Sequence, residues 1–265
     1  MIRFSSNIEM LHNNEPFLDR IENAKEAGFD AIEFWSWEDK DLHEIRQRCE
    51  ALGLFVSSLS GDGSEYSLCD DSHLKGYVDY ARASFESAKM VGSSLVVIHS
   101  NALLGGNVVD AYDAVPISRL SMNMVKTLLA LAPYAEREGI TCVLEPLNRH
   151  VDHPGNLLHT LHDAAHVVQV VNSPNIKLLY DLYHMQIECG NLCNNYDRYR
   201  KYVGHVHIAD HPGRHEPGTG EIHYPKVLSH MAGQGYEGVF AFELSPARSW
   251  EEAVHAIMNL REMYL

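Results

Sequence analysis

The chain has 265 residues, of which 45% are hydrophobic and 22% are charged. This length suits one α/β barrel, which typically takes about 250 residues, and the composition is ordinary for a globular protein. The formal net charge of −15 opposes binding to nucleic acid, because a phosphate backbone normally meets a basic face. We therefore expect one domain over residues 1–265 that binds a small molecule.

The sequence carries no expected targeting or membrane segment. The N-terminus MIRFSSNIEML lacks the long apolar region and the small-residue cleavage site of a signal peptide. The longest apolar runs have the length of a strand, far short of a membrane span. Five cysteines, an odd number in a chain large enough to fold without disulfides, favour reduced thiols. These features predict a cytoplasmic protein with no membrane partner.

Strand-like apolar runs alternate with amphipathic helical stretches along the chain. The predicted strands cover residues 2–5, 31–35, 55–59, 95–100, 141–147, 177–183, 205–210 and 239–244. The predicted helices cover roughly 15–27, 39–52, 72–91, 114–138, 157–171, 194–201, 224–234 and 249–263. Such alternation is typical of βα units with a parallel sheet. Eight units predict the α/β fold class and a single (β/α)8 TIM barrel.

Three long segments follow predicted strands, at 60–71, 100–113 and 210–223. Barrel enzymes build their active sites from the loops at the carboxyl ends of the strands. Loops of this length in a compact domain usually serve a site. The segment 210–223, which reads DHPGRHEPGTGEIH, is the densest in glycine, proline and charge.

Four strand-like runs each carry one metal-capable side chain at or near the carboxyl end. They are TCVLEPLN with Glu145, KLLYDLYH with Asp181, GHVHIAD with His207 and VFAFELS with Glu243. Carboxylate oxygens with one imidazole suit Mn²⁺, Mg²⁺ or Co²⁺, with Zn²⁺ as an alternative. Singly, each residue has an ordinary explanation, such as capping a loop or a short helix. Each acid follows an apolar run that would bury it, however, and a buried carboxylate needs a partner. We expect one divalent cation.

Neighbouring polar residues extend this site. His205 and His207 face the same side of their strand, and we place His207 at the mouth and His205 one layer deeper, with the reverse assignment left open. His184, just past its strand end, is expected to support the metal or to contact a substrate oxygen. Arg214 suits a substrate oxyanion because its forked donors match carboxylate geometry; solvated surface charge is the alternative.

The segments LEPLN, YDLYHMQIECGNL, HVHIADHPGRHEPGTGEIHYPKVL and FELSP together resemble the hydroxypyruvate isomerase family. That family belongs to the xylose isomerase-like barrel superfamily, with ketose 3-epimerases, inosose-processing enzymes and endonuclease IV as relatives. The resemblance is strong over 140–246 and weaker but collinear from FSSNIEML through AGFDAIEFW. The RHEPGTGEI motif is quite specific, whereas the isolated strand-end acids are less so.

The resemblance implies a paired-glutamate mechanism. Glu145 and Glu243 would be catalytic, facing each other across the substrate and binding the cation together with Asp181 and His207. One glutamate would remove the proton from the carbon beside a carbonyl, with the metal stabilising the enediolate. Return of the proton to the adjacent carbon gives aldose–ketose isomerisation, and return from the opposite face gives epimerisation.

The resemblance also implies substrate contacts. His184 and Arg214 match positions that hold substrate oxygens in relatives, and His99, Asn148 and Trp35 complete the expected set. Aromatic residues at the end of the second strand wall the site in relatives, although core packing is an equal alternative here. Relatives are often homodimers or homotetramers, and the sequence selects neither assembly.

Two departures leave the reaction open. Hydroxypyruvate isomerases usually carry glutamine where this chain has His207, whereas ketose 3-epimerases carry histidine. Conversely, epimerases typically show a glutamate six residues after the first ligand, where this chain has Val151. The RHEPGTGEI, DLYHMQI and GNL motifs favour an isomerase acting on a short oxidised sugar or oxo acid such as hydroxypyruvate. A ketose 3-epimerase is the alternative.

Two further classes remain as alternatives. An endonuclease IV-type nuclease needs three zinc ions and would have a ligand aspartate where this chain has Gly213. This missing ligand and the net charge of −15 both argue against a nuclease. A non-catalytic sugar-binding barrel shares the fold. Loss of activity on replacing Glu145 or Glu243 would separate the enzyme from the binding protein.

Overall fold

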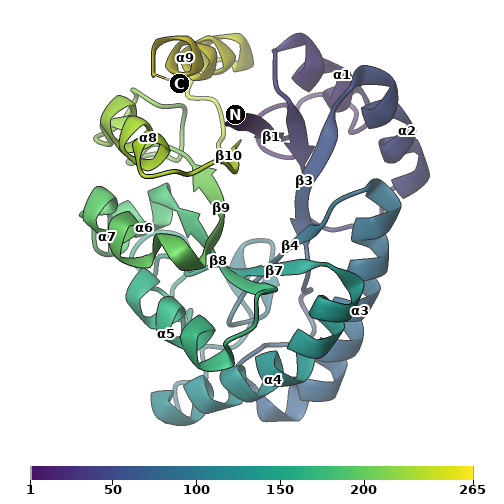
Figure 1. Cartoon of the computed structure of the whole chain (residues 1–265), viewed down its shortest axis with the longest axis vertical. Coiled ribbons are helices and arrows are strands. Elements are labelled where there is room, and N and C mark those ends of the chain that lie inside the picture. Colours follow the sequence, from purple (N-terminus) through teal and green to yellow (C-terminus); the bar gives the residue numbers. More distant parts are fainter. Residues whose placement is uncertain (1, 265) are drawn as a thin grey trace.

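The computed structural model describes residues 2–264 and shows a closed barrel of eight parallel strands surrounded by helices (Figure 1). The strands pair in the order β1-β10-β9-β8-β7-β4-β3-β2. Their bounds are β1 Arg3–Asn7, β2 Ala31–Glu33, β3 Phe55–Ser60, β4 Leu95–Ile98, β7 Thr141–Leu144, β8 Ile176–Asp181, β9 Val203–Ile208 and β10 Val239–Phe242. The predicted TIM barrel is confirmed.

Helices follow the strands and cover the outside of the barrel (Figure 1). They are α1 Asp19–Glu26, α2 Leu42–Leu52, α3 Leu74–Val91, α4 Ile117–Glu138, α5 Leu161–Val171, α6 Leu182–Glu188, α7 Leu192–Tyr199, α8 Tyr224–Gly233 and α9 Trp250–Tyr264, with 3-10 turns η1 Asp71–His73 and η2 Arg200–Tyr202. Within residues 2–264, none of these helices is both long and apolar enough to cross a membrane.

Barrel closure joins the first strand to the last. Residues Arg3 to Ser6 of β1 pair in parallel with Val239 to Phe242 of β10. The ring of Phe4 packs against the rings of Phe240 and Phe242, with centroids 6.3 and 4.9 Å apart. These rings are fully buried in the main hydrophobic cluster beneath the helices. This apolar seam therefore holds the two ends of the sheet together.

Alternation along the strands separates the helix-facing core from the barrel interior. Val206 and Ile208 of β9 belong to the main hydrophobic cluster. Because successive side chains of a strand point to opposite faces, His205 and His207 face the interior. These polar side chains therefore lie inside the barrel, and the predicted site lies at the end of the barrel where the strands have their carboxyl ends.

The structure differs from the prediction mainly at the carboxyl ends of the strands. The expected strand 177–183 ends at Asp181, and α6 begins directly after it, because an Asp181 carboxylate oxygen accepts the backbone N–H of His184 and caps the new helix. The segment 100–113 contains an unpredicted hairpin, β5 Leu103–Leu104 with β6 Asn107–Val108. Gly105 and Gly106 both have positive φ, as a two-residue hairpin turn requires.

Replacing Phe4 by alanine should lower the free energy of unfolding by about 3–5 kcal/mol, because it leaves a cavity in the closing seam. Urea denaturation followed by circular dichroism measures the change. Met122→Ala on the exposed side of α4, where the side chain is 67% exposed, is the matched control and should change stability by less than about 0.5 kcal/mol. Equal effects for both variants would contradict the role assigned to the seam.

Candidate active site and metal centre

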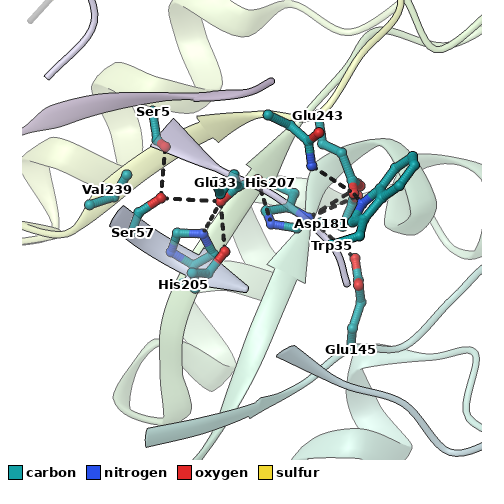
Figure 2. Close-up of polar contacts among 12 residues, drawn as sticks. Ser5, Glu33, Trp35, Ser57, Glu145, Asp181, His205, His207, Val239 and Glu243 are labelled. Atoms are coloured by element: carbon teal, nitrogen blue, oxygen red, sulfur yellow. Dashed lines mark hydrogen bonds and ion pairs between the residues drawn. The ribbon is translucent and has the colours of Figure 1, made fainter. Parts of the chain in front are cut away.

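The four strand-end residues converge on one point at the carboxyl end of the barrel. Figure 2 shows the side chains of Glu145, Asp181, His207 and Glu243 directed toward one another. One ligand atom from each lies within 4.8 Å of every other. From Nδ1 of His207, the nearest carboxylate oxygens are at 3.3 Å (Glu243), 3.5 Å (Glu145) and 3.9 Å (Asp181). The four form a compact set of three carboxylates and one imidazole.

This set fits a divalent cation. All four residues are buried, with at most 6% of any of them exposed. Oε1 of Glu145 and Nδ1 of His207 are buried and have no hydrogen-bond partner among residues 2–264. Unpartnered buried polar atoms are rare and costly in native proteins. Oxygen donors with one imidazole nitrogen are ligands that Mn²⁺, Mg²⁺ and Co²⁺ accept, so the group could hold a metal ion.

Charge balance supports the same interpretation. Burial and the charge of Glu145 raise the pKa of Asp181 to about 7. Burial alone would also raise the pKa of Glu243, but the charges of Arg214 and His207 lower it. For Glu145, the interactions with His207 and His99 outweigh burial and hold the pKa well below its usual range. The centre therefore gathers negative charge that a cation would offset.

Asp181 serves two elements at once. Its Oδ1 accepts the N–H of His184 at 3.0 Å, whereas its Oδ2 faces the ring of His207. The sequence reasoning treated helix capping and metal binding as alternatives for this residue. The structure combines both, because each carboxylate oxygen has its own direction.

Glu243 is held by three donors around its carboxylate. The indole N–H of Trp35 donates to Oε1 at 2.8 Å, and the amide of Asn7 lies 3.4 Å from the same atom. The guanidinium of Arg214 donates to Oε2 at 2.5 Å. Trp35 is 45% exposed and lines the cavity. Trp35 thus has a polar role that the sequence reasoning, which expected a substrate contact or core packing, did not include.

The loop over 210–223 is tied down by Asp210, which is fully buried. Its Oδ1 accepts the backbone N–H groups of His211 and Ile222, and its Oδ2 accepts that of Gly218. These bonds close the loop on itself. They bring Arg214 to the cavity wall, where its guanidinium stacks 5.2 Å from the ring of Tyr183.

His184 is oriented by Asn148. The Asn148 side-chain amide lies 2.7 Å from Nδ1 of His184, and the backbone N–H of Asn148 donates to the same nitrogen. Because Nδ1 accepts, the ring proton sits on Nε2, which is buried without a hydrogen-bond partner in the described part of the chain. Burial and the charge of Arg214 hold the pKa of His184 well below its usual value. His184 therefore keeps one N–H that no described residue accepts, on a nitrogen 3.7 Å from Oδ2 of Asp181.

Asn148 itself does not reach the cavity. It is fully buried behind His184, and its amide also donates to Asp152 at 2.6 Å. The sequence predicted that Asn148 contacts the substrate, but the structure places its side chain outside the cavity lining. Asn148 instead supports His184 through the two hydrogen bonds to its Nδ1.

His99 lies between two carboxylates. Its Nδ1 is 3.1 Å from Asp62 and its Nε2 is 3.2 Å from Glu145. Burial would lower the pKa of His99, but the charge of Asp62 and hydrogen bonds to both acids raise it to about 10. The ring lines the cavity edge, yet both of its nitrogens face protein groups.

A cavity of about 600 Å³ opens over the centre. Its apolar lining includes Phe34 and Trp35, which directly follow β2, and Leu103 and Leu104 of β5. Arg214 is the one arginine or lysine among the described lining residues. Small-molecule sites typically combine such an apolar lining with a few placed polar groups.

Sequence reasoning missed Glu33 and Asp62. Glu33 ends β2 and lies 3.2 Å from Nε2 of His207 and 3.1 Å from Nε2 of His205. The run Ala31-Ile32-Glu33 carries the same signal as Glu243, an acid at the end of an apolar strand, directly before the aromatic residues Phe34 and Trp35. His162 and His166, by contrast, lie exposed on α5, away from this site.

The profile of the xylose isomerase-like TIM barrel family matches residues 21–262 of this chain. The chain therefore belongs to the xylose isomerase-like TIM barrel family. It is 30% identical to hydroxypyruvate isomerase of Escherichia coli K12, over 95% of this chain and 96% of that protein. It is 29% identical to 2-oxo-tetronate isomerase of Cupriavidus necator, over 93% and 94%. The expected enzyme class, an isomerase, is confirmed by these relatives.

Solved structures share the same architecture. A protein from Brucella melitensis described as an AP endonuclease of family 2 superposes with a TM-score of 0.87 at 25% identity, covering 98% of this chain and 99% of its own. D-psicose 3-epimerase from Clostridium cellulolyticum H10 superposes with a TM-score of 0.84 at 18% identity, with 99% of both chains covered. The second likeness shows the fold alone.

In the metal-free protein, the raised pKa of Asp181 makes stability depend on pH. The unfolded chain releases this proton near pH 4, whereas the folded protein keeps it up to about pH 7. Binding of this proton therefore contributes to the free energy of unfolding below pH 4, and this contribution is lost as the pH rises through about 7. With a chelator present, the free energy of unfolding of wild type relative to Asp181→Asn should fall across this range, by at most about 1.4 kcal/mol per pH unit. A difference that does not change with pH would contradict the assignment.

Proposed function

We propose that this protein is a divalent-metal-dependent isomerase that transfers a proton between adjacent carbons of a short oxidised sugar or oxo acid, such as hydroxypyruvate or a 2-oxo-tetronate. The observation that carries the proposal is the convergence of the two buried glutamates, Glu145 and Glu243, with Asp181 and His207 under one cavity. The similarity to hydroxypyruvate and 2-oxo-tetronate isomerases over nearly the whole chain supports it.

Substrate orientation would depend on two cavity residues. His184 lines the cavity, and its Nε2–H, which has no hydrogen-bond partner among the described residues, can donate to a substrate hydroxyl or carbonyl oxygen. Arg214 retains a buried Nε group without a hydrogen-bond partner among the described residues. Its guanidinium can meet a carboxylate or oxyanion of the substrate while still bonded to Glu243.

Proton transfer would fall to the paired glutamates. Glu145 follows β7 and Glu243 follows β10, so the two carboxylates enter the cavity from separated strands of the barrel. One carboxylate removes the proton beside the carbonyl, and a carboxylic acid returns it to the neighbouring carbon. A bound divalent cation, held by Glu145, Asp181, His207 and Glu243, would supply charge stabilisation for the carbonyl and hydroxyl oxygens of the substrate.

A ketose 3-epimerase is the second candidate. The placement of two carboxylates on separated strands suits removal of a proton from one face and delivery to the other. Val151 stands where epimerases typically place a glutamate against a substrate hydroxyl, and its side chain is exposed. This difference favours the isomerase.

Glu145→Gln and Glu243→Gln should each lower kcat by about 100-fold to 10,000-fold, because an amide cannot act as a general base. The assay follows incorporation of solvent deuterium at carbon and product formation with hydroxypyruvate, tartronate semialdehyde, 2-oxo-tetronates and free ketoses. His230→Gln serves as a control, because its ring pairs with Asp197 on the outer helices. Wild-type protein that binds metal but exchanges no proton across the panel would instead indicate a non-catalytic sugar-binding barrel.

Chelation should remove activity and lower thermal stability together. Re-addition of Mn²⁺, Mg²⁺ or Co²⁺ should restore both, since a cation at 100 times its Kd stabilises the folded state by about 2.7 kcal/mol. Thermal unfolding and turnover are measured on the same samples, with His230→Gln treated in parallel. Full activity after exhaustive chelation would exclude a metal-dependent reaction.

A further inference from the structure

A continuous chain of hydrogen bonds reaches Glu145 from outside the four-residue centre. The hydroxyl of Tyr77 on α3 donates to Oδ2 of Asp62 at 3.0 Å, and the backbone N–H of His99 donates to the same oxygen at 2.6 Å. Oδ1 of Asp62 lies 3.1 Å from Nδ1 of His99, and Nε2 of His99 lies 3.2 Å from Oε2 of Glu145. Asp62, His99 and Glu145 follow the three adjacent strands β3, β4 and β7.

This chain distinguishes the two oxygens of Glu145. Oε2 is bonded to His99, whereas Oε1 has no hydrogen-bond partner in residues 2–264 and lies 3.5 Å from Nδ1 of His207. Glutamate has three rotatable side-chain bonds, so its carboxylate keeps one direction only if a neighbour holds it. His99 is the neighbour that does so on the side away from the centre.

Asp62 in turn determines the direction of the His99 ring. It accepts both the ring N–H at Nδ1 and the backbone N–H of the same residue, so the ring is held at two points. With Nδ1 engaged by Asp62 and Nε2 engaged by Glu145, His99 has no free nitrogen for a substrate. A carboxylate that orients a histidine toward a reacting group is also the arrangement of catalytic triads.

We propose that Asp62 and His99 are positioning residues for Glu145: Asp62 holds the His99 ring so that its Nε2 donates to Oε2, which leaves Oε1 directed at the cation and the substrate. This inference rests on the proposed function of Glu145. Glu243 is oriented differently, by Trp35 and Arg214. The two glutamates are therefore held by separate networks, and loss of the His99 network should impair Glu145 without changing the contacts of Glu243.

Two substitutions of the same residue separate positioning from packing. In His99→Gln, the amide nitrogen stands near the place of Nε2 and can still donate to Glu145. In His99→Asn, the amide stands near the place of Nδ1 and can reach only Asp62. Asp62→Asn supplies one acceptor where the carboxylate supplies two, so it should loosen the ring while keeping the volume. His230→Gln, taken from the His230–Asp197 pair outside the site, is the matched control.

The readouts are kcat and KM with the best substrate of the panel, and the Kd for Mn²⁺ alone by calorimetry. Loss of a group that orients a metal ligand typically costs about 10-fold to 100-fold in metal affinity or activity. His99→Asn and Asp62→Asn should lose kcat and Mn²⁺ affinity in that range, with KM unchanged within about threefold. His99→Gln should retain at least about tenfold more kcat than His99→Asn.

Three results would overturn the inference. A rise in KM with unchanged kcat would make His99 a substrate contact. Equal kcat for His99→Gln and His99→Asn would show that no donor at the position of Nε2 is required. Changes under twofold in all three variants would show that the network does not affect Glu145. Circular dichroism identifies a variant that does not fold, and the remaining variants still decide the question. Full activity of Glu145→Gln would instead refute the proposed function.

Discussion

Burial of three carboxylates and one imidazole at the same end of a barrel is the constraint around which the rest of the structure is arranged. Charged groups removed from water must be compensated by partners. Glu145, Asp181 and Glu243 stand within reach of His207, yet Oε1 of Glu145 and Nδ1 of His207 have no hydrogen bond within the described chain. A divalent cation would satisfy these atoms together.

The barrel geometry itself brings these residues together. Parallel strands of a closed barrel all present their carboxyl ends at one mouth, so residues distant in sequence meet there without special loops. Each ligand then acquires its own support: His99 behind Glu145, the N–H of His184 on Asp181, Glu33 beside His207, and Arg214 on Glu243. Groups that orient metal ligands commonly matter nearly as much as the ligands themselves.

The barrel and the four converging residues could be predicted from the sequence, because the signal is local and repeated. An apolar run that ends in an acid or a histidine specifies both a buried strand and a strand-end polar group. The supporting residues could not be assigned in this way. Asp62 and Asn148 act through side chains that are far from them in sequence, and these partners become visible only when the strands are adjacent in space.

Local chain geometry also limited the prediction. The expected strand through Tyr183 stops at Asp181, because its carboxylate caps a helix that amphipathic periodicity over seven residues cannot reveal. Trp35 was expected to touch substrate or core, but its indole N–H bonds Glu243. In both cases the side chain makes an interaction in the folded chain that the pattern of apolar and polar residues does not predict.

The most direct test of the account is a crystal structure of the protein soaked with Mn²⁺, with the ion located by its anomalous scattering. We expect one strong peak at the barrel mouth, with one oxygen each of Glu145, Asp181 and Glu243 and with Nδ1 of His207 as its protein ligands. A protein that stays free of Mn²⁺ at this position, or an ion bound by other residues, would contradict it.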